Sequence, residues 1–220
     1  MSERHGSEDL HGNAPDKSDV ALLLIDLIND LEFAEGDQLL RFVRPMAERI
    51  AALKQQAKRA GIPAIYVNDN FGRWRSNFEA QVDHCIKDNV RGRVLAERLR
   101  PEEDDYFVLK PKHSGFFSTT LDILLDYLQV RTVILTGIAA NICVLFTAND
   151  AYMRDFRLVV PSDCVASNTA DDNRYALEQM RTVLKADIRP SSELDLDVLT
   201  RDTSGGPMRR PGTAPPAGRT

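Results

Sequence analysis

The feature that most constrains the fold is a series of short, continuous apolar runs separated by longer stretches with helical spacing. The run 20–25, VALLLI, is apolar at every position. Such a run is typical of a strand that helices cover on both faces. Further β-branched and aliphatic runs follow at 64–67, 106–109, 131–136 and 157–160. The alternation predicts an α/β protein, a three-layer α/β/α sandwich with a mainly parallel, Rossmann-like sheet.

The segments between these runs predict the helices. Apolar residues recur at three- and four-residue spacing from Leu39 to Leu53, and this helix is expected to end at Gly61. Other helices are expected at about 118–129, 141–154 and 171–185, with a short last strand at 186–188. For the 141–154 helix, the expected buried stripe is Ile142, Leu145, Phe146, Ala148 and Tyr152.

The segment 68–78, NDNFGRWRSNF, is too polar for a buried element and too aromatic for a plain linker. We interpret it as a long surface loop, and loops of this kind often hold ligands.

Composition indicates one globular domain between two tails. The ends 1–17 and 204–220 are rich in Gly, Pro and polar residues and have little to bury, so both are expected to be disordered. The remaining 18–203 is long enough for one hydrophobic core. With 43% hydrophobic residues and no long apolar run, the chain has no membrane-span candidate.

Charge and cysteine content narrow the expected partners and compartment. The net charge of −5 is modest and the basic residues are scattered, so neither nucleic acid nor a membrane surface is the expected partner. A small-molecule substrate fits better. The three cysteines lack the paired spacing of a zinc site and are odd in number, which indicates a reducing compartment. The N-terminal segment has no apolar secretory core, so the cytoplasm is the expected location.

Polar side chains that include a carboxylate, an amine and a thiol follow several of the predicted strands. In open parallel sheets, ligands bind at the carboxyl ends of the strands. The residues at or just beyond these ends are Asp26, Asn68, Lys110, Cys143 and Asp163. A nucleophile, a carboxylate and an amine are therefore expected to meet on one rim of the sheet.

Each of these residues has a simpler interpretation when taken alone. A lone Asp at a strand end is more often a turn residue, a lone Lys is usually solvated, and a lone Cys is usually a small core residue. We assign that last role to Cys85 and Cys164. Cys143 differs because it is expected near a helix N-terminus and beside a cation, where the reactive thiolate is favoured.

Three ordered blocks of the sequence resemble a known family. They are ALLLIDLINDLEF, VLKPKHSGFFSTTLDILL and GIAANICVLFTANDAYMRDF, which contain the patterns K-x-x-x-S-x-F and G-[IV]-x-x-x-x-C-V. Together they resemble the isochorismatase-like cysteine hydrolase superfamily over roughly residues 19–190. That superfamily includes nicotinamidase, N-carbamoylsarcosine amidohydrolase and ureidoacrylate amidohydrolase.

The resemblance implies a catalytic triad of Asp26, Lys110 and Cys143. Lys110 is preferred to Lys112 because the family lysine lies four residues before the serine, here Ser114. The resemblance also implies a cis peptide between Ile138 and Ala139, which would aim the Ala139 amide inward.

The expected mechanism starts with transfer of the Cys143 thiol proton to Asp26, while the Lys110 ammonium stabilises the charge. The backbone amides of Ala139 and Cys143 would hold the oxyanion. Asp26 would then protonate the leaving nitrogen and activate the water that hydrolyses the thioester.

Departures from family patterns narrow the chemistry further. Nicotinamidases carry a metal site with an Asp-x-His element and further histidines after the second strand. The corresponding segment here, NDNFGRWRSNF, has no histidine, and the chain has only 4. We therefore expect no metal and no other cofactor. Activation of Cys143 is expected to need no histidine base.

By position in family members, Trp74 and Asn68 are candidate substrate contacts, although Trp74 could equally pack its loop onto the core or a neighbouring subunit.

Isochorismatases proper cleave a vinyl ether without a nucleophilic cysteine, so the presence of Cys143 favours the amidohydrolase branch. The expected activity is hydrolysis of a carbon–nitrogen bond in a small amide, ureido or carbamoyl compound. Two alternatives stay open, a vinyl ether hydrolase of the isochorismatase type and a non-catalytic binding or assembly module. The resemblance also implies a homo-oligomer, either a dimer or a tetramer.

Overall fold

The computed structural model describes residues 17–71 and 77–201 of the chain, and the elements lie in the predicted α/β order. The strands are β1 (Val20–Ile25), β2 (Ala64–Asp69), β3 (Tyr106–Lys110), β4 (Thr132–Ile138), β5 (Arg157–Val159) and β6 (Val165–Ala166). The α-helices are α1 (Gly36–Arg59), α2 (Phe78–Lys87), α3 (Arg93–Arg98), α4 (Leu121–Tyr127), α5 (Leu145–Tyr152), α6 (Ala170–Thr182) and α7 (Leu196–Arg201). A π-helical turn, Ala140–Val144, precedes α5, and a short 3₁₀ turn, Ser191–Glu193, precedes α7.

The sheet is parallel throughout, and its order places the first strand in the centre. Over the described residues it has six strands, in the order β3-β2-β1-β4-β5, with β6 also pairing with β4. In β1, every side chain is fully buried, as a continuous apolar run in a covered strand requires. All strands therefore point their carboxyl ends toward the same edge of the sheet.

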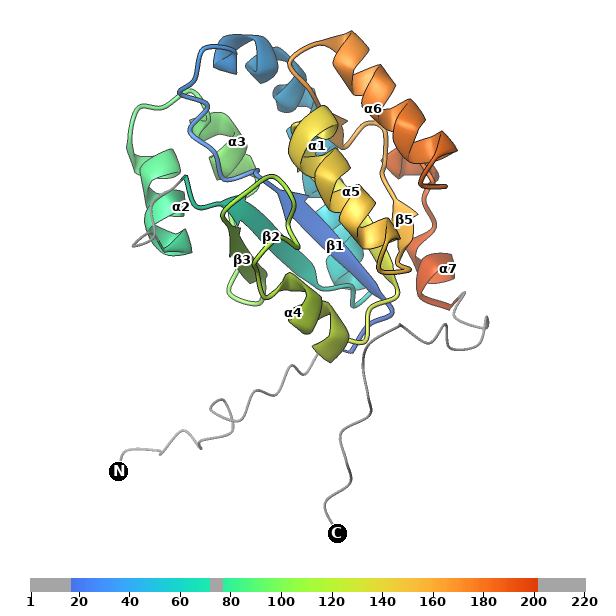
Figure 1. The fold of residues 1–220 in the computed structure, drawn as a ribbon. Coiled ribbons are helices and arrows are strands. Elements are labelled where there is room, and N and C mark those ends of the chain that lie inside the picture. Colours follow the sequence, from blue (N-terminus) through green and yellow to red (C-terminus); the bar gives the residue numbers. More distant parts are fainter. Residues whose placement is uncertain (1–16, 72–76, 202–220) are drawn as a thin grey trace, which may run out of the picture.

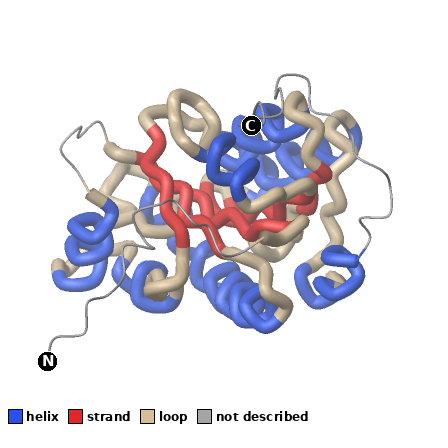
Figure 2. The backbone as a smooth tube through the Cα atoms, turned by 90° about the horizontal axis from the view of Figure 1, so that it is seen from below, coloured by secondary structure: helices blue, strands red, loops and turns tan. Residues whose placement is uncertain are grey.

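Helices cover both faces of this sheet (Figure 1). Figure 2 shows the strands between two helical layers. Leu22 and Leu24 face the core built with α1, α2, α3 and α7. Leu23 and Ile25 face the other core, built with α4, α5 and α6. The three-layer sandwich with a parallel sheet is thus confirmed.

Helix α1 follows directly from its sequence pattern. Its residues Leu39, Val43, Met46 and Ile50 are spaced by three or four and are buried. The helix ends at Arg59, and Gly61 adopts a φ of +67°, a left-handed conformation that glycine takes without steric cost. In the described parts of the chain, no helix is both long and apolar enough to cross a membrane.

Several expectations about local structure were wrong. The sequence analysis did not predict α2, α3, β6 or α7, which are short and weakly patterned. The expected strand at 186–188 is reduced to a single bridge between Val159 and Asp187.

The expected buried stripe of the helix that follows β4 was right at Ala148 but wrong at Phe146 and Tyr152. Phe146 and Tyr152 are 53% and 46% exposed, while Thr147, Ala148 and Ala151 are buried. Small residues face inward because a loop packs tightly there. The Gly115 amide of this loop donates to Thr147 Oγ1 at 3.0 Å. Close approach, and not side-chain hydrophobicity alone, selects the inner face of α5.

Candidate active site

Asp26 lies directly beyond β1 and is held firmly in place. Its φ of 52° is left-handed, a conformation that aspartate tolerates better than most residues. The side chain is only 5% exposed, and Oδ1 accepts a hydrogen bond of 2.7 Å from the Asp69 amide. Burial raises the pKa of Asp26 above its ordinary value, against the opposing effects of Lys110 and of a hydrogen bond from the Cys143 thiol. The result is a carboxylate of increased basicity beside the thiol.

Lys110 ends β3 and is fully buried. Its Nζ lies 2.8 Å from Asp26 Oδ2 and 3.5 Å from Asp69 Oδ2, and it donates to Cys143 Sγ at 3.5 Å. An ammonium has three N–H donors, so these three acceptors match its capacity. Burial alone would lower the pKa of Lys110, but Asp26 and Cys143 together raise it above its ordinary value, so the amine is a cation at neutral pH.

Cys143 lies in the π-helical turn that follows β4, and its side chain is partly exposed. Burial and the Asp26 carboxylate raise the pKa of the Cys143 thiol to about 12, although Lys110 acts in the opposite direction. In the free protein, the thiol therefore keeps its proton at neutral pH. A nucleophile of this kind needs a base beside it.

The peptide bond between Ile138 and Ala139 is cis, as the resemblance implied. It directly precedes the turn that carries Cys143. The preceding Gly137 has a φ of +119°, and a Cβ there would lie 2.0 Å from the carbonyl oxygen of Ile25. Only glycine allows β4 to approach the end of β1 this closely.

The loop after Lys110 is tied to the helix after Cys143. Thr147 Oγ1 donates to the Cys143 carbonyl at 2.7 Å and accepts from the Gly115 amide at 3.0 Å. The Ser114 hydroxyl donates to the carboxylate of Asp150. These contacts fix the distance between the two segments that supply the amine and the thiol.

A matching family model covers most of the chain. The model of the isochorismatase domain matches residues 20–188. The chain belongs to the isochorismatase family of hydrolases. It is 44% identical to the uncharacterized isochorismatase family protein YaaI of Bacillus subtilis, over 81% of this chain and 97% of that protein.

Other isochorismatase-family relatives carry names that state an activity. The chain is 28% identical to a ureidoacrylate amidohydrolase, RutB, of Methylorubrum extorquens, over 74% of this chain and 77% of that protein. Its structure resembles that of N-carbamoylsarcosine amidase from Thermoplasma acidophilum with a TM-score of 0.62 and 27% identity. That match covers 80% of this chain and 98% of the other.

Of the two substrate contacts expected from the sequence, only Asn68 lies in the described part of the chain. The Asn68 side chain is fully buried, and its Nδ2 donates to the Ile28 carbonyl at 2.6 Å. Asn68 thereby supports the loop that follows Asp26. Trp74 lies outside the described residues. Asp163, also expected on the rim, instead accepts hydrogen bonds from the amide and hydroxyl of Ser191 at 2.7 and 2.8 Å.

The structure adds a residue that the sequence analysis had set aside. His113 Nδ1 lies 3.9 Å from Cys143 Sγ, and its ring packs against Phe146 with centroids 5.4 Å apart. One histidine therefore lies beside the thiol, while the expectation that activation of Cys143 needs no histidine base stays a prediction. The sequence shows only that His113 lies three residues after Lys110, on the loop that ends at the family serine, and this spacing does not place its ring at the sulfur.

No three side chains of His, Cys, Asp or Glu gather into a possible metal site within 17–71 and 77–201.

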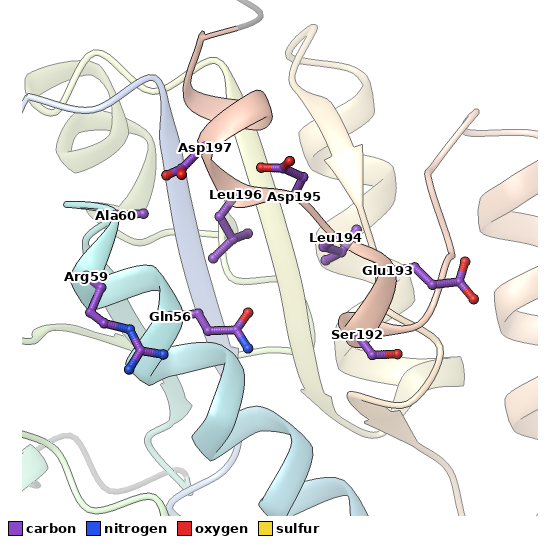
Figure 3. Close-up of a pocket in the computed structure, with 9 residues that line it drawn as sticks. All are labelled: Gln56, Arg59, Ala60, Ser192, Glu193, Leu194, Asp195, Leu196 and Asp197. Carbon is purple, nitrogen blue, oxygen red and sulfur yellow. The ribbon is translucent and has the colours of Figure 1, made fainter.

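A separate pocket lies between the C-terminal end of α1 and residues 192–197 (Figure 3). Since α1 ends just before β2 begins, this pocket is at the amino ends of the strands, opposite the triad. Its acidic side chains, Glu193, Asp195 and Asp197, do not converge, because Glu193 points away from α1.

Proposed function

We propose that this chain is a cysteine-dependent, metal-independent hydrolase that cleaves a carbon–nitrogen bond of a small amide, ureido or carbamoyl substrate through a thioester on Cys143. The observation that carries the proposal is the position of Lys110 Nζ, 2.8 Å from Asp26 and 3.5 Å from Cys143 Sγ. The names of the two relatives, a ureidoacrylate amidohydrolase and an N-carbamoylsarcosine amidase, support this bond type.

In the first half of the reaction, Asp26 accepts the proton of the Cys143 thiol as the sulfur attacks the substrate carbonyl. The raised pKa of Asp26 favours this transfer. Lys110 stays protonated and stabilises the negative charge as it moves from the carboxylate to the sulfur. The three side chains together therefore keep the same net charge, because the proton only moves from Cys143 to Asp26.

The tetrahedral oxyanion is then held by the backbone amides of Ala139 and Cys143, which belong to one turn after β4. Asp26 returns its proton to the leaving nitrogen, and ammonia or an amine departs. The acyl group is left on Cys143 as a thioester, which water must hydrolyse to free the enzyme.

Metal independence is part of the proposal because the segment after β2 offers few ligands. Asp69 is followed at the second position by Phe71, which has no ligand atom, where nicotinamidases have histidine. Lys110 supplies the positive charge beside the nucleophile.

Trp74 is proposed as an aromatic wall for the substrate. The buried side-chain amide of Asn68 is instead assigned to supporting the loop that follows Asp26.

We also propose that the enzyme works in the cytoplasm as a homo-oligomer, a dimer or a tetramer. The free state of Cys85, Cys143 and Cys164 supports a reducing compartment. Light scattering on the purified chain measures the oligomeric state.

The proposal is tested by screening small amides, ureides and carbamoyl compounds for release of ammonia or amine. Cys143→Ala should abolish release while the circular dichroism spectrum stays unchanged. Cys85→Ala, which removes a cysteine that is 2% exposed, is the matched control and should keep activity. Full activity of Cys143→Ala would rule the thioester out.

Two other results would point to the alternatives. Release of pyruvate from a vinyl ether substrate would show an isochorismatase-type reaction. A thiol that reacts with no mild electrophile, in a protein that releases no product, would favour a binding or assembly module.

A further inference from the structure

The histidine beside the thiol is exposed, whereas the ion pair beside the same thiol is buried. Asp26 and Lys110 are 5% and 0% exposed, whereas His113 is an exposed residue with Nδ1 at 3.9 Å from Cys143 Sγ. We propose that His113 is a further catalytic residue, the general base that activates the hydrolytic water and then returns a proton to the sulfur. This role rests on the proposed function, because it requires a thioester on Cys143.

The direction of water entry favours His113 over Asp26 for this step. The Asp26 carboxylate touches the thiol but is only 5% exposed, and it is packed against the Asp69 amide at 2.7 Å and Lys110 at 2.8 Å, so water has little access to it. An acyl group on Sγ would further cover this buried carboxylate. Cys143 is partly exposed and His113 is exposed, so the proposed water approaches the thioester beside the imidazole.

Lys110 and Asp69, the other charged groups beside Asp26, are less suited to this role. Lys110 is a cation whose three donors are matched by Asp26, Asp69 and Cys143, so it has no lone pair to offer. The Asp69 carboxylate is shared between Lys110 at 3.5 Å and the Phe71 amide at 2.6 Å. A neutral imidazole, in contrast, carries one free acceptor nitrogen.

The protein holds His113 in this position through its neighbours. The next residue, Ser114, is bound to Asp150 on α5, and the Gly115 amide is bound to Thr147 at 3.0 Å. Thr147 in turn holds the Cys143 carbonyl at 2.7 Å. The ring itself packs against Phe146. An exposed side chain is thus positioned relative to the sulfur by the contacts of the two residues that follow it and by the contact of its ring with Phe146.

The proposed step balances in atoms and charge. The water oxygen bonds to the thioester carbonyl carbon, and one water proton moves to Nδ1 of His113. The tetrahedral intermediate collapses with cleavage of the carbon–sulfur bond, and the electron pair leaves with the sulfur. The carboxylic or carbamic acid product departs, and protonated His113 gives its proton to the Cys143 thiolate. The enzyme returns to its starting state without another reactant.

The test uses p-nitrophenyl acetate as the acyl donor, because it acylates cysteine enzymes without needing the natural substrate. Release of p-nitrophenol reports acylation of the full-length protein, and mass spectrometry of the Cys143 peptide reports how long the acetyl group stays. For His113→Gln, we expect an unchanged acylation burst and about 100-fold slower deacetylation, the usual contribution of one general base. Imidazole added to His113→Ala should restore deacetylation.

Lys112→Gln is the matched control, since Lys112 is an exposed neighbour on the same loop. It should acylate and deacylate as the wild type does. Equal acetyl lifetimes in His113→Gln and wild type would overturn the role of His113 while leaving the thioester mechanism standing. Failure of the wild-type Cys143 to become acetylated would count against the proposed function itself, and against the role of His113 with it.

Discussion

Lys110 and Asp26 form an ion pair across an intervening strand. Lys110 ends β3 and Asp26 follows β1, with β2 between them, yet Nζ and Oδ2 are 2.8 Å apart and both side chains are buried. A buried pair of this kind loses much of its hydration, so each charge depends on the other. The same two side chains therefore contribute to the stability of the folded protein and to the activation of the Cys143 thiol.

Removal of one partner of this pair should be costly. Lys110→Met leaves the Asp26 carboxylate buried without its main counter-charge, and we expect the free energy of unfolding to fall by about 3–5 kcal/mol. The double variant Asp26→Asn/Lys110→Met should lose less than the sum of the two single variants. Urea titrations at pH 7 measure all three. Strictly additive losses would show that the two charges do not depend on each other.

Lys54 offers a control for the catalytic part of this effect. It is another buried lysine, 2.5 Å from Asp105, and it lies on α1 away from the thiol. Lys54→Met should also destabilise the protein but should keep acetylation of Cys143, whereas Lys110→Met should lose both.

The reactivity of Cys143 toward iodoacetamide should depend steeply on pH. Because the thiol pKa is raised to about 12, the thiolate fraction, and with it the alkylation rate, should rise about tenfold per pH unit from pH 7 to 10. Peptide-resolved mass spectrometry separates Cys143 from the other cysteines. A rate that levels off near neutral pH would show a stable thiolate in the free enzyme instead.

Two variants should move this pH profile in opposite directions. Asp26 raises the thiol pKa and Lys110 lowers it. Asp26→Asn should therefore speed alkylation at a given pH although it abolishes turnover, and Lys110→Met should slow alkylation. Slower alkylation in Asp26→Asn would mean that the carboxylate does not oppose the thiolate.

The sequence predicted the parts of the molecule that rest on continuous apolar runs. VALLLI and RTVILT became the paired central strands β1 and β4, and the rule for parallel sheets placed Asp26, Lys110 and Cys143 on one rim. These inferences succeeded because burial of a strand on both faces leaves a strong pattern.

The position of His113 could not be obtained in this way. It depends on the path of the loop between Ser114 and Lys110, which is set by the contact of Gly115 with Thr147 on another element. The inward face of α5 depends on the same close contact. Loop paths and close approaches arise from tertiary packing, so neither periodicity nor residue type reveals them.

Asn68 should contribute to stability more than to substrate affinity. Its Nδ2 donates to the buried Ile28 carbonyl at 2.6 Å, and its own side chain is fully buried. Asn68→Ala leaves that carbonyl without this donor and should lower the free energy of unfolding by about 1–3 kcal/mol. Thermal and urea unfolding measure the loss. Unchanged stability with a large increase in KM would identify Asn68 as a substrate contact after all.

Gly137 should be the most sensitive glycine near the site. It has a φ of +119°, and a Cβ added there would lie 2.0 Å from the Ile25 carbonyl oxygen, immediately before Asp26. Gly137→Ala therefore combines a strained backbone with a collision against β1, and we expect a loss of more than about 4 kcal/mol. Since the collision pushes β1 and β4 apart, acetylation of Cys143 in the remaining folded protein should also slow.

Gly61→Ala separates the effect of backbone strain from the effect of a collision between the new Cβ and a neighbouring strand. Gly61 also has a positive φ, of +67°, but a Cβ there meets nothing within 4 Å. Its replacement should cost only the strain of the left-handed conformation, about 1–2 kcal/mol, and should leave acetylation unchanged. Urea titrations of both variants, with p-nitrophenol bursts from the same samples, make the comparison. Similar losses for the two glycines would mean that backbone conformation, and not the close approach of β4 to β1, makes Gly137 necessary.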